Sequence, residues 1–243
     1  MATSGDYYFN LTRDQIIDQA AVKAGVMDPE GGGISQIQRA NAATNLNTMI
    51  AAWQADGLQI WTRLIVPITM VIGQASYLLG PAGATGNLQR PIRINDGYIR
   101  QTAGQNDTPV KILSLEEYNR FGMKNTAGLP TQVFYHPLLT NGKVLVYPVP
   151  TVANTLYLEM HYPFQQFTCG SDTADFPNEW MNALVYGLAV ELAYDYGVDT
   201  KRLSKLEMRA EMLHRAALAT SQENSVYMQP DYAASGGFWN SRG

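Results

Sequence analysis

Seven side chains in the sequence are of the types that perform acid–base, nucleophilic or metal chemistry. They are Glu191, Asp172, Asp175, Cys169, His136, His161 and His214. A hydrolase needs an acid, a base or a nucleophile placed within reach of its partner, and a zinc site pairs its histidines at short spacing. The histidines here are isolated, and the single cysteine has no histidine near it in sequence. We therefore expect no catalytic residue, no metal site and no cofactor.

The acids and His161 each have a structural interpretation. We expect Glu191 to be a core carboxylate paired with an arginine, and the alternative is an acid whose pKa is raised by burial. Asp172 and Asp175 are expected to be charges at the N-terminal end of a helix, where carboxylates meet the positive pole of the helix dipole. His161 lies in a strand-like run and is expected to be a half-buried structural residue.

Residues 172–197 predict the helix around which the chain is organised. Pro177 is tolerated in a first helical turn, and Gly197 supplies a left-handed residue that ends a helix. Between residues 180 and 194 only Asn182 and Glu191 are strongly polar, which is typical of a buried helix. The apolar run is shorter than the roughly 20 residues that span a bilayer, so we expect a core helix and no membrane association.

Two helices are predicted near the N-terminus. Thr12 and Gln15 form a capping box for the first, and Gly25 ends it. Ser35 and Gln38 begin the second. We expect these two helices to form an antiparallel pair. The apolar seam expected for the second helix is Ile37, Leu46, Met49, Ile50 and Trp53.

The middle of the chain alternates with a period of two residues, which predicts strands. The run from Leu64 to Ile72 is expected to form a hairpin with residues 77–79, and Pro67 favours an edge strand. The pair Asn141-Gly142 predicts another hairpin. Ser114 begins a short helix. Other strand-like segments are 92–100, 133–135, 143–147 and 156–162.

A final helix is predicted to begin at Asp199 or Thr200. Its apolar seam is Leu203, Leu206, Ala210, Leu213 and Ala217. The basic residues near its start are Lys201, Arg202 and Lys205. A solvated helix face explains this basic cluster, and the alternatives are contact with an acidic partner or with a phosphate backbone.

The last residues lose all periodicity but keep large side chains. The large side chains are Tyr227, Met228, Tyr232, Phe238 and Trp239. They lie among serine, glycine, asparagine and glutamine, which cannot build a core alone. We therefore interpret residues 226–243 as an extended C-terminal tail that docks on a partner.

Composition and pattern together predict an α+β fold. The chain has 243 residues, is 46% hydrophobic and carries a net charge of -4, which argues against a dedicated nucleic-acid binder. The lone Cys169 fits assembly in a reducing cytoplasm, and no signal peptide is seen. We expect one domain over residues 1–225. In it a helical bundle from both ends of the chain (about 12–57 and 176–222) carries a β-rich insert (about 60–165).

Several of these motifs resemble a known family. Residues 8–20 (YFNLTRDQIIDQA), 46–58 (LNTMIAAWQADGL), 147–150 (YPVP) and 175–180 (DFPNEW) are similar to the head-to-tail adaptor proteins of short-tailed bacteriophages. These are also called connector or packaged-DNA-stabilisation proteins. The resemblance covers most of residues 9–217. In contrast to the shortest, mainly helical members, this chain carries a long β-rich insert.

The resemblance implies a structural virion protein and not an enzyme. Such proteins form a homo-oligomeric ring beneath the portal after DNA packaging, with the portal's twelve-fold symmetry, and build the platform for the tail nozzle. DNA then passes through the channel without specific binding. Two alternatives stay open: a virion-associated peptidoglycan hydrolase with Glu191, Asp172 or Asp175 as its acid, and a DNA-end-binding head-completion protein that uses Lys201, Arg202 and Lys205.

Overall fold

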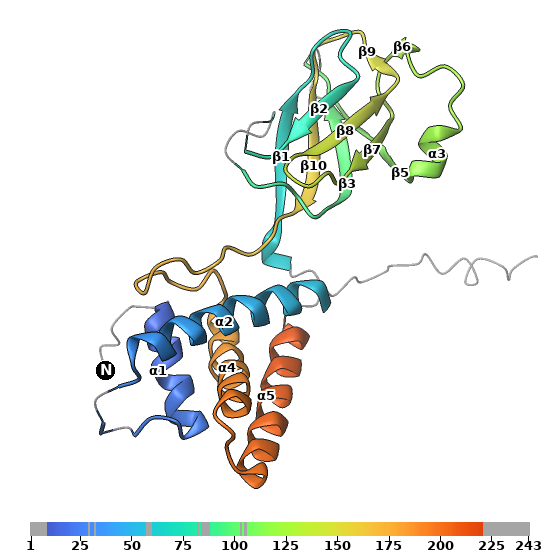
Figure 1. Ribbon diagram of the computed structural model, residues 1–243. Coiled ribbons are helices and arrows are strands. Elements are labelled where there is room, and N and C mark those ends of the chain that lie inside the picture. The colour runs from blue at the N-terminus through green and yellow to red at the C-terminus, as the bar shows by residue number, and fades with distance from the viewer. Residues whose placement is uncertain are drawn as a thin grey trace, which may run out of the picture.

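The computed structural model describes residues 9–28, 30–31, 33–56, 60–81, 83, 88–102, 104 and 106–220. It confirms a mixed α+β fold, with a helical part from both ends of the chain and a β-rich part from the middle (Figure 1). Each part has its own buried cluster of apolar side chains. The tail, residues 226–243, lies outside the described residues.

Four long helices build the helical part. They are α1 (Arg13–Ala24), α2 (Gln36–Asp56), α4 (Met181–Asp195) and α5 (Thr200–Thr220). Helix α4 stands between α1 and α5, and α2 lies across the others (Figure 1). The expected antiparallel pairing of α1 with α2 is wrong, because α1 packs mainly against α4. The apolar stripe of α1 includes small alanines at 20, 21 and 24 that are fully buried, which lets a neighbouring helix approach closely.

The predicted helix ends are confirmed at several places. The Thr12 side chain accepts a hydrogen bond from the backbone N–H of Gln15 at 3.3 Å, and the Gln15 side chain accepts one from the Thr12 N–H at 3.0 Å. Ser35 and Gln38 make the same reciprocal bonds at the start of α2, at 3.3 and 2.8 Å. Gly25 ends α1 with φ of 79°. Local hydrogen bonding of this kind depends on nearby residues alone, so it can be predicted from sequence.

Two expectations about helix burial are wrong. Ile37, placed in the seam of α2, is 77% exposed. Helix α4 begins after a short 3-10 turn, η2 (Asn178–Trp180), and buries most but not all of its surface. Glu191 and Tyr194 lie on its exposed side, so the expected buried ion pair of Glu191 does not form. The exposed side of α4 still carries apolar and aromatic residues, which sequence hydrophobicity cannot distinguish from buried ones.

Two four-stranded sheets form the β-rich part. The first has the order β1 (Arg63–Thr69), β10 (Thr155–His161), β3 (Arg93–Arg100), β4 (Asp107–Pro109). The second has the order β2 (Ser76–Leu79), β8 (Gly142–Tyr147), β7 (Gln132–His136), β5 (Lys111–Leu113). The smaller elements are η1 (Ile60–Thr62), α3 (Leu115–Asn119), β6 (Ala127–Gly128) and β9 (Val149–Pro150). Strands β6 and β9 pair in parallel as a third, two-stranded sheet.

The sheet pairing confirms one predicted hairpin and corrects another. Strands β7 and β8 pair antiparallel around the turn at Asn141, with His136 opposite Lys143. In contrast, β1 and β2 do not form a hairpin: β1 pairs with β10, β2 pairs with β8, and the turn around Gly73 (φ 77°) leads from one sheet to the other. Pro67 lies in β1, which is an edge strand as expected.

The two parts meet where the chain enters and leaves the β-rich part. The Tyr162 N–H donates to the Thr62 carbonyl at 3.0 Å, so the two crossing segments lie side by side. Next to this bond, Trp61 contacts the Phe164 ring, with 6.0 Å between centroids, and the Trp180 ring at 5.3 Å. This aromatic cluster connects the start of η1 to the helical core.

His161 lies at the same junction and is fully buried, where only half burial was expected. It is 1% exposed, its Nδ1 lies 3.2 Å from the Thr62 hydroxyl oxygen, and its Nε2 has no hydrogen-bond partner among the described residues. Burial, with the nearby Arg63 and Arg93, lowers the His161 pKa below its ordinary value of 6.5. Protonation would place a charge in a poorly solvated site, so this ring is neutral in the folded protein at pH 7.

A pH dependence of stability follows from this lowered pKa. Below about pH 6.5 the unfolded chain binds a proton at His161 that the folded chain resists, so the stabilisation present at pH 7 is lost as the pH falls. We expect His161→Gln to reduce the drop in melting temperature between pH 7 and pH 5. The exposed His136→Gln on β7 is the matched control and should leave that drop unchanged. An identical drop in the wild type and both variants would contradict this assignment.

Candidate assembly surfaces of the helical part

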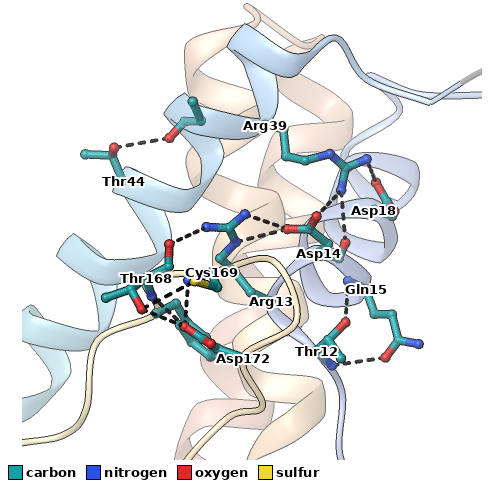
Figure 2. Close-up of polar contacts among 12 residues, drawn as sticks. Thr12, Arg13, Asp14, Gln15, Asp18, Arg39, Thr44, Thr168, Cys169 and Asp172 are labelled. Atoms are coloured by element: carbon teal, nitrogen blue, oxygen red, sulfur yellow. Dashed lines mark hydrogen bonds and ion pairs between the residues drawn. The ribbon is translucent and has the colours of Figure 1, made fainter.

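The loop formed by residues 168–172 lies between β10 and α4 in the chain and contacts the start of α1 (Figure 2). The Asp172 carboxylate accepts hydrogen bonds from the backbone N–H groups of Thr168 and Cys169, at 2.7 and 2.6 Å, and from the Thr168 hydroxyl at 3.0 Å. These bonds lower the Asp172 pKa. The Asp172 carbonyl accepts from the Arg13 N–H at 2.8 Å. Asp172 therefore closes this loop, and its expected role as a charge at the end of a helix is wrong.

A network of charged side chains joins the same loop to both N-terminal helices (Figure 2). Arg13 lies 2.9 Å from Asp14 and donates to the Thr168 carbonyl at 3.3 Å. Arg39 of α2 lies 2.7 Å from Asp18 and 3.6 Å from Asp14 of α1. Each carboxylate in the network faces a guanidinium. The arrangement holds α1, α2 and the loop in register, which is a structural role.

The other candidates for chemistry are dispersed over the fold. Cys169 is exposed in the loop, and Asp175 is exposed before Pro177. His136 lies on β7, while His214 lies on α5 and stacks on Trp53 with 4.6 Å between ring centroids. Among the described residues no cluster of three or more histidine, cysteine, aspartate or glutamate side chains could hold a metal ion. The structure does not bring these residues together into one site.

The predicted basic cluster divides into two roles. Lys201 and Lys205 are exposed on the first turns of α5. Arg202 instead reaches back to α1 and donates to the Lys23 carbonyl at 3.1 Å. A side chain at Gly25 would collide with this guanidinium, 2.2 Å from its nearest atom. Arg202 therefore caps the C-terminal end of α1, a role that sequence reasoning missed because the two residues lie far apart in the chain.

The helical part carries a hollow of about 440 Å³ between α2 and α4, lined by residues that include Asn41, Asn45 and Leu192. Two further hollows concern the surfaces discussed below, and sequence reasoning predicted none of the three. One, of about 300 Å³, lies where α2, α4 and α5 meet, with Trp53, Gly187 and His214 in its wall and Glu191, Glu207 and Glu211 at its rim. The other, of about 310 Å³, lies on α1, and we call it the α1 hollow. It is lined by Asp18, Gln19, Val22, Lys23 and Met27.

A larger cavity, of about 910 Å³, lies at the junction of the two parts. Its walls mix aromatic side chains such as Trp61 and Phe164 with polar ones such as Gln165 and Asp175. The residues that line this cavity do not indicate a particular reaction. None of the described helices is both long enough and apolar enough to cross a membrane.

The fold and these surfaces define a structural class of protein: a helical scaffold with a β-rich insert, exposed apolar residues, and acids held in structural hydrogen bonds. Comparison with protein families gives a specific result. The family model described as SU10 adaptor protein matches residues 11–234. The chain belongs to this family, which is a family of phage head-to-tail adaptors, and the resemblance seen in the sequence is confirmed. It is a family of structural proteins and not of enzymes. A search of curated proteins found no match.

Proposed function

We propose that this chain is a virion protein that forms a ring beneath the portal after DNA packaging, retains the packaged DNA and builds the platform for the tail nozzle. The observation that carries the proposal is the family match over residues 11–234. The ring assembles in the host cytoplasm and stays at the head–tail junction of the virion. It contains twelve copies if it follows the symmetry of the portal. A net charge of -4 suits a channel through which DNA slides without binding tightly.

In this proposal the chain acts as one domain over residues 1–225, with the helical bundle as the body of the ring and the β-rich insert directed to the tail. The turn between β1 and β2 lies at the end of the insert farthest from the helices (Figure 1). It exposes Val71 and Ile72, and Gly73 is tied by its N–H to the Pro150 carbonyl at 2.9 Å, close to the exposed Val152. Residues 64–89 and 144–158 contain no charged side chain. Such an uncharged, apolar end favours contact with another protein surface.

The proposal also assigns residues to the portal. The tail, residues 226–243, docks through Tyr227, Met228, Tyr232, Phe238 and Trp239. Aromatic and methionine side chains of this kind are enriched at the centres of interfaces. Lys201 and Lys205 add a basic contact at the start of α5. Arg202 belongs to the same cluster, but its guanidinium already donates to the Lys23 carbonyl.

Deleting residues 225–243 tests the proposed role of the tail. We expect the truncated protein to keep its melting temperature, because the large side chains of the tail lie among serine, glycine, asparagine and glutamine, which cannot build a core alone. We also expect it to lose stable attachment to portal rings, because each buried anchor of this type contributes about 2 kcal/mol or more and a ring repeats the contact. The measurements are thermal melting and co-sedimentation with purified portal.

The matched control replaces Lys201 and Lys205 with alanine in the full-length chain. This change should weaken attachment in a salt-dependent way without abolishing it. If the truncated protein unfolds, or if it attaches to portal as well as the full-length chain does, the docking role of the tail is wrong.

A further inference from the structure

Helix α5 exposes a second row of side chains on the side opposite its buried seam. The row is spaced alternately by four and three residues, which places its members on one face of a helix. Its members are Lys201, Lys205, Met208, Met212, Arg215 and Ala219. We call this row the α5 stripe.

The centre of the α5 stripe is apolar and exposed. Met208 is 64% exposed and Met212 is 51% exposed, whereas Leu206 and Ala217 on the inner side are buried. Lys201 and Lys205 give the N-terminal half of the stripe a positive charge. Helix α5 has 21 residues and is about 30 Å long. A second seam at this spacing is typical of a helix that packs against two neighbours. Among the described residues, the inner side of α5 packs against α4 and the side that carries the stripe is exposed.

The α1 hollow has the complementary character. Val22 and Met27 give it apolar walls, and Lys23, which also lines it, has its amine 5.8 Å from the centroid of the Tyr186 ring. The loop that follows α1 exposes two acids, Asp28 and Glu30. The α1 hollow is an apolar depression beside two exposed carboxylates. The α5 stripe is an apolar ridge beside two exposed ammonium groups, so the two surfaces are complementary in shape and in charge.

The two surfaces belong to opposite flanks of the helical part. Helix α4 packs against α1 and against α5, and it stands between them (Figure 1). A chain with complementary surfaces on opposite flanks cannot satisfy both within one molecule. It joins head to tail with further copies, and this type of contact closes into a ring when the rotation between copies allows.

We propose that the α5 stripe of one copy packs into the α1 hollow of the next copy. The occupant of each surface is therefore a second copy of this chain, and Met208 and Met212 are the central contacts. Methionine suits this position because its flexible, unbranched side chain fits irregular hollows. The inference rests on the proposed function in that it supplies the contact of the proposed ring, and it makes no use of the tail. It places Lys201 and Lys205 against the neighbouring copy, so their expected salt-dependent effect on portal attachment would act through assembly of the ring.

A mixing experiment tests the head-to-tail contact. The stripe variant carries Met208→Glu and Met212→Glu, and the hollow variant carries Gln19→Glu and Val22→Glu, so the two altered surfaces repel each other. In analytical ultracentrifugation we expect the wild type to self-associate with increasing concentration and each variant alone to lose all species larger than a monomer. An equimolar mixture of the two should form a dimer and nothing larger, because each pair retains one intact stripe and one intact hollow.

The control variant carries Leu115→Glu and Met123→Glu in the β-rich part, which remove equally exposed apolar side chains and should leave self-association unchanged. Melting temperatures establish that every variant is folded. A mixture that stays monomeric while the wild type associates would overturn the proposal. Dimers formed by the hollow variant alone would also overturn it, because they would show a symmetric contact between two α5 helices.

A cross-linking measurement covers the case in which copies assemble only on the portal. In a Cys169→Ser background, Gln19→Cys and Met212→Cys together should give a ladder of linked chains under oxidation, alone or on portal rings, whereas either cysteine alone should give none. The absence of a ladder on assembled particles would overturn the contact.

If the stripe variant still forms the assembly but does not attach to portal, the stripe binds portal and the proposal is wrong. If the ladder forms but the chain never attaches to portal, the contact stands and the proposed function fails.

Discussion

Replacing Trp180 with alanine is expected to lower the free energy of unfolding by about 3 to 5 kcal/mol, the usual cost of deleting a large aromatic core side chain. Trp180 is 1% exposed. Its ring lies 5.7 Å from Trp53 of α2, 5.3 Å from Trp61 of η1 and 6.0 Å from Phe176, measured between centroids. One side chain therefore connects α2, α4 and the junction with the β-rich part.

Denaturant unfolding monitored by circular dichroism measures this loss. Trp180→Phe is the matched control, because it keeps an aromatic ring and should cost less than half as much. An alanine variant that loses less than about 1 kcal/mol, a typical value for any substitution, would show that the cluster repacks around the missing ring and that Trp180 does not hold the helical part together.

Replacing Gly187 with leucine is expected to destabilise the chain by about 2 to 3 kcal/mol, because it overpacks a helix crossing. A Cβ atom at Gly187 would lie 2.7 Å from the Met49 sulfur and 3.0 Å from the Trp53 ring. The glycine thus lets α2 approach α4 closely, and a longer side chain must push α2 away. Because α2 reaches over the other helices, this displacement should also disturb the hollow where α2, α4 and α5 meet.

A double-mutant cycle with Met49→Ala isolates this contact. The smaller residue opposite position 187 creates room for the leucine, so we expect the two changes together to cost at least about 1 kcal/mol less than their sum. Strictly additive costs would mean that the leucine is destabilising for some reason other than its contact with Met49.

Local features of the fold were predictable from the sequence. The capping boxes at Thr12 and Ser114, the helix end at Gly25 and the hairpin turn at Asn141 all depend on residues within a few positions of each other. The structure shows each of them where the sequence places it.

Features that depend on distant residues were not predictable. The run that contains β1 alternates as a hairpin strand would, but its partner is β10, about ninety residues later. Glu191 lies in an apolar sequence, yet it is exposed beside the hollow where α2, α4 and α5 meet. Which positions of α4 its neighbours cover depends on how those helices cross it. A hydrophobic pattern predicts that a segment is buried, but it does not identify the element that packs against it.

The candidate surfaces show the same division. The basic residues at the start of α5 were visible in the sequence, but the separate role of Arg202 required the position of the Lys23 carbonyl. The spacing of Met208 and Met212 is also present in the sequence, although it becomes informative only once the opposite side of α5 is known to be filled. The α1 hollow was not predicted although its lining residues lie close together in sequence, because the position of Met27 depends on how the chain turns after Gly25.

The bond between the Tyr162 N–H and the Thr62 carbonyl has a consequence for how such chains change in length. The hundred or so residues between these two positions leave the helical part and return to it at adjacent points, so the two ends of this segment lie as close together as the ends of a tight turn. Insertions, deletions or a wholesale exchange of this segment can therefore occur without moving α2 or the loop that precedes α4. The β-rich part can therefore differ between related chains while the helical part keeps its geometry.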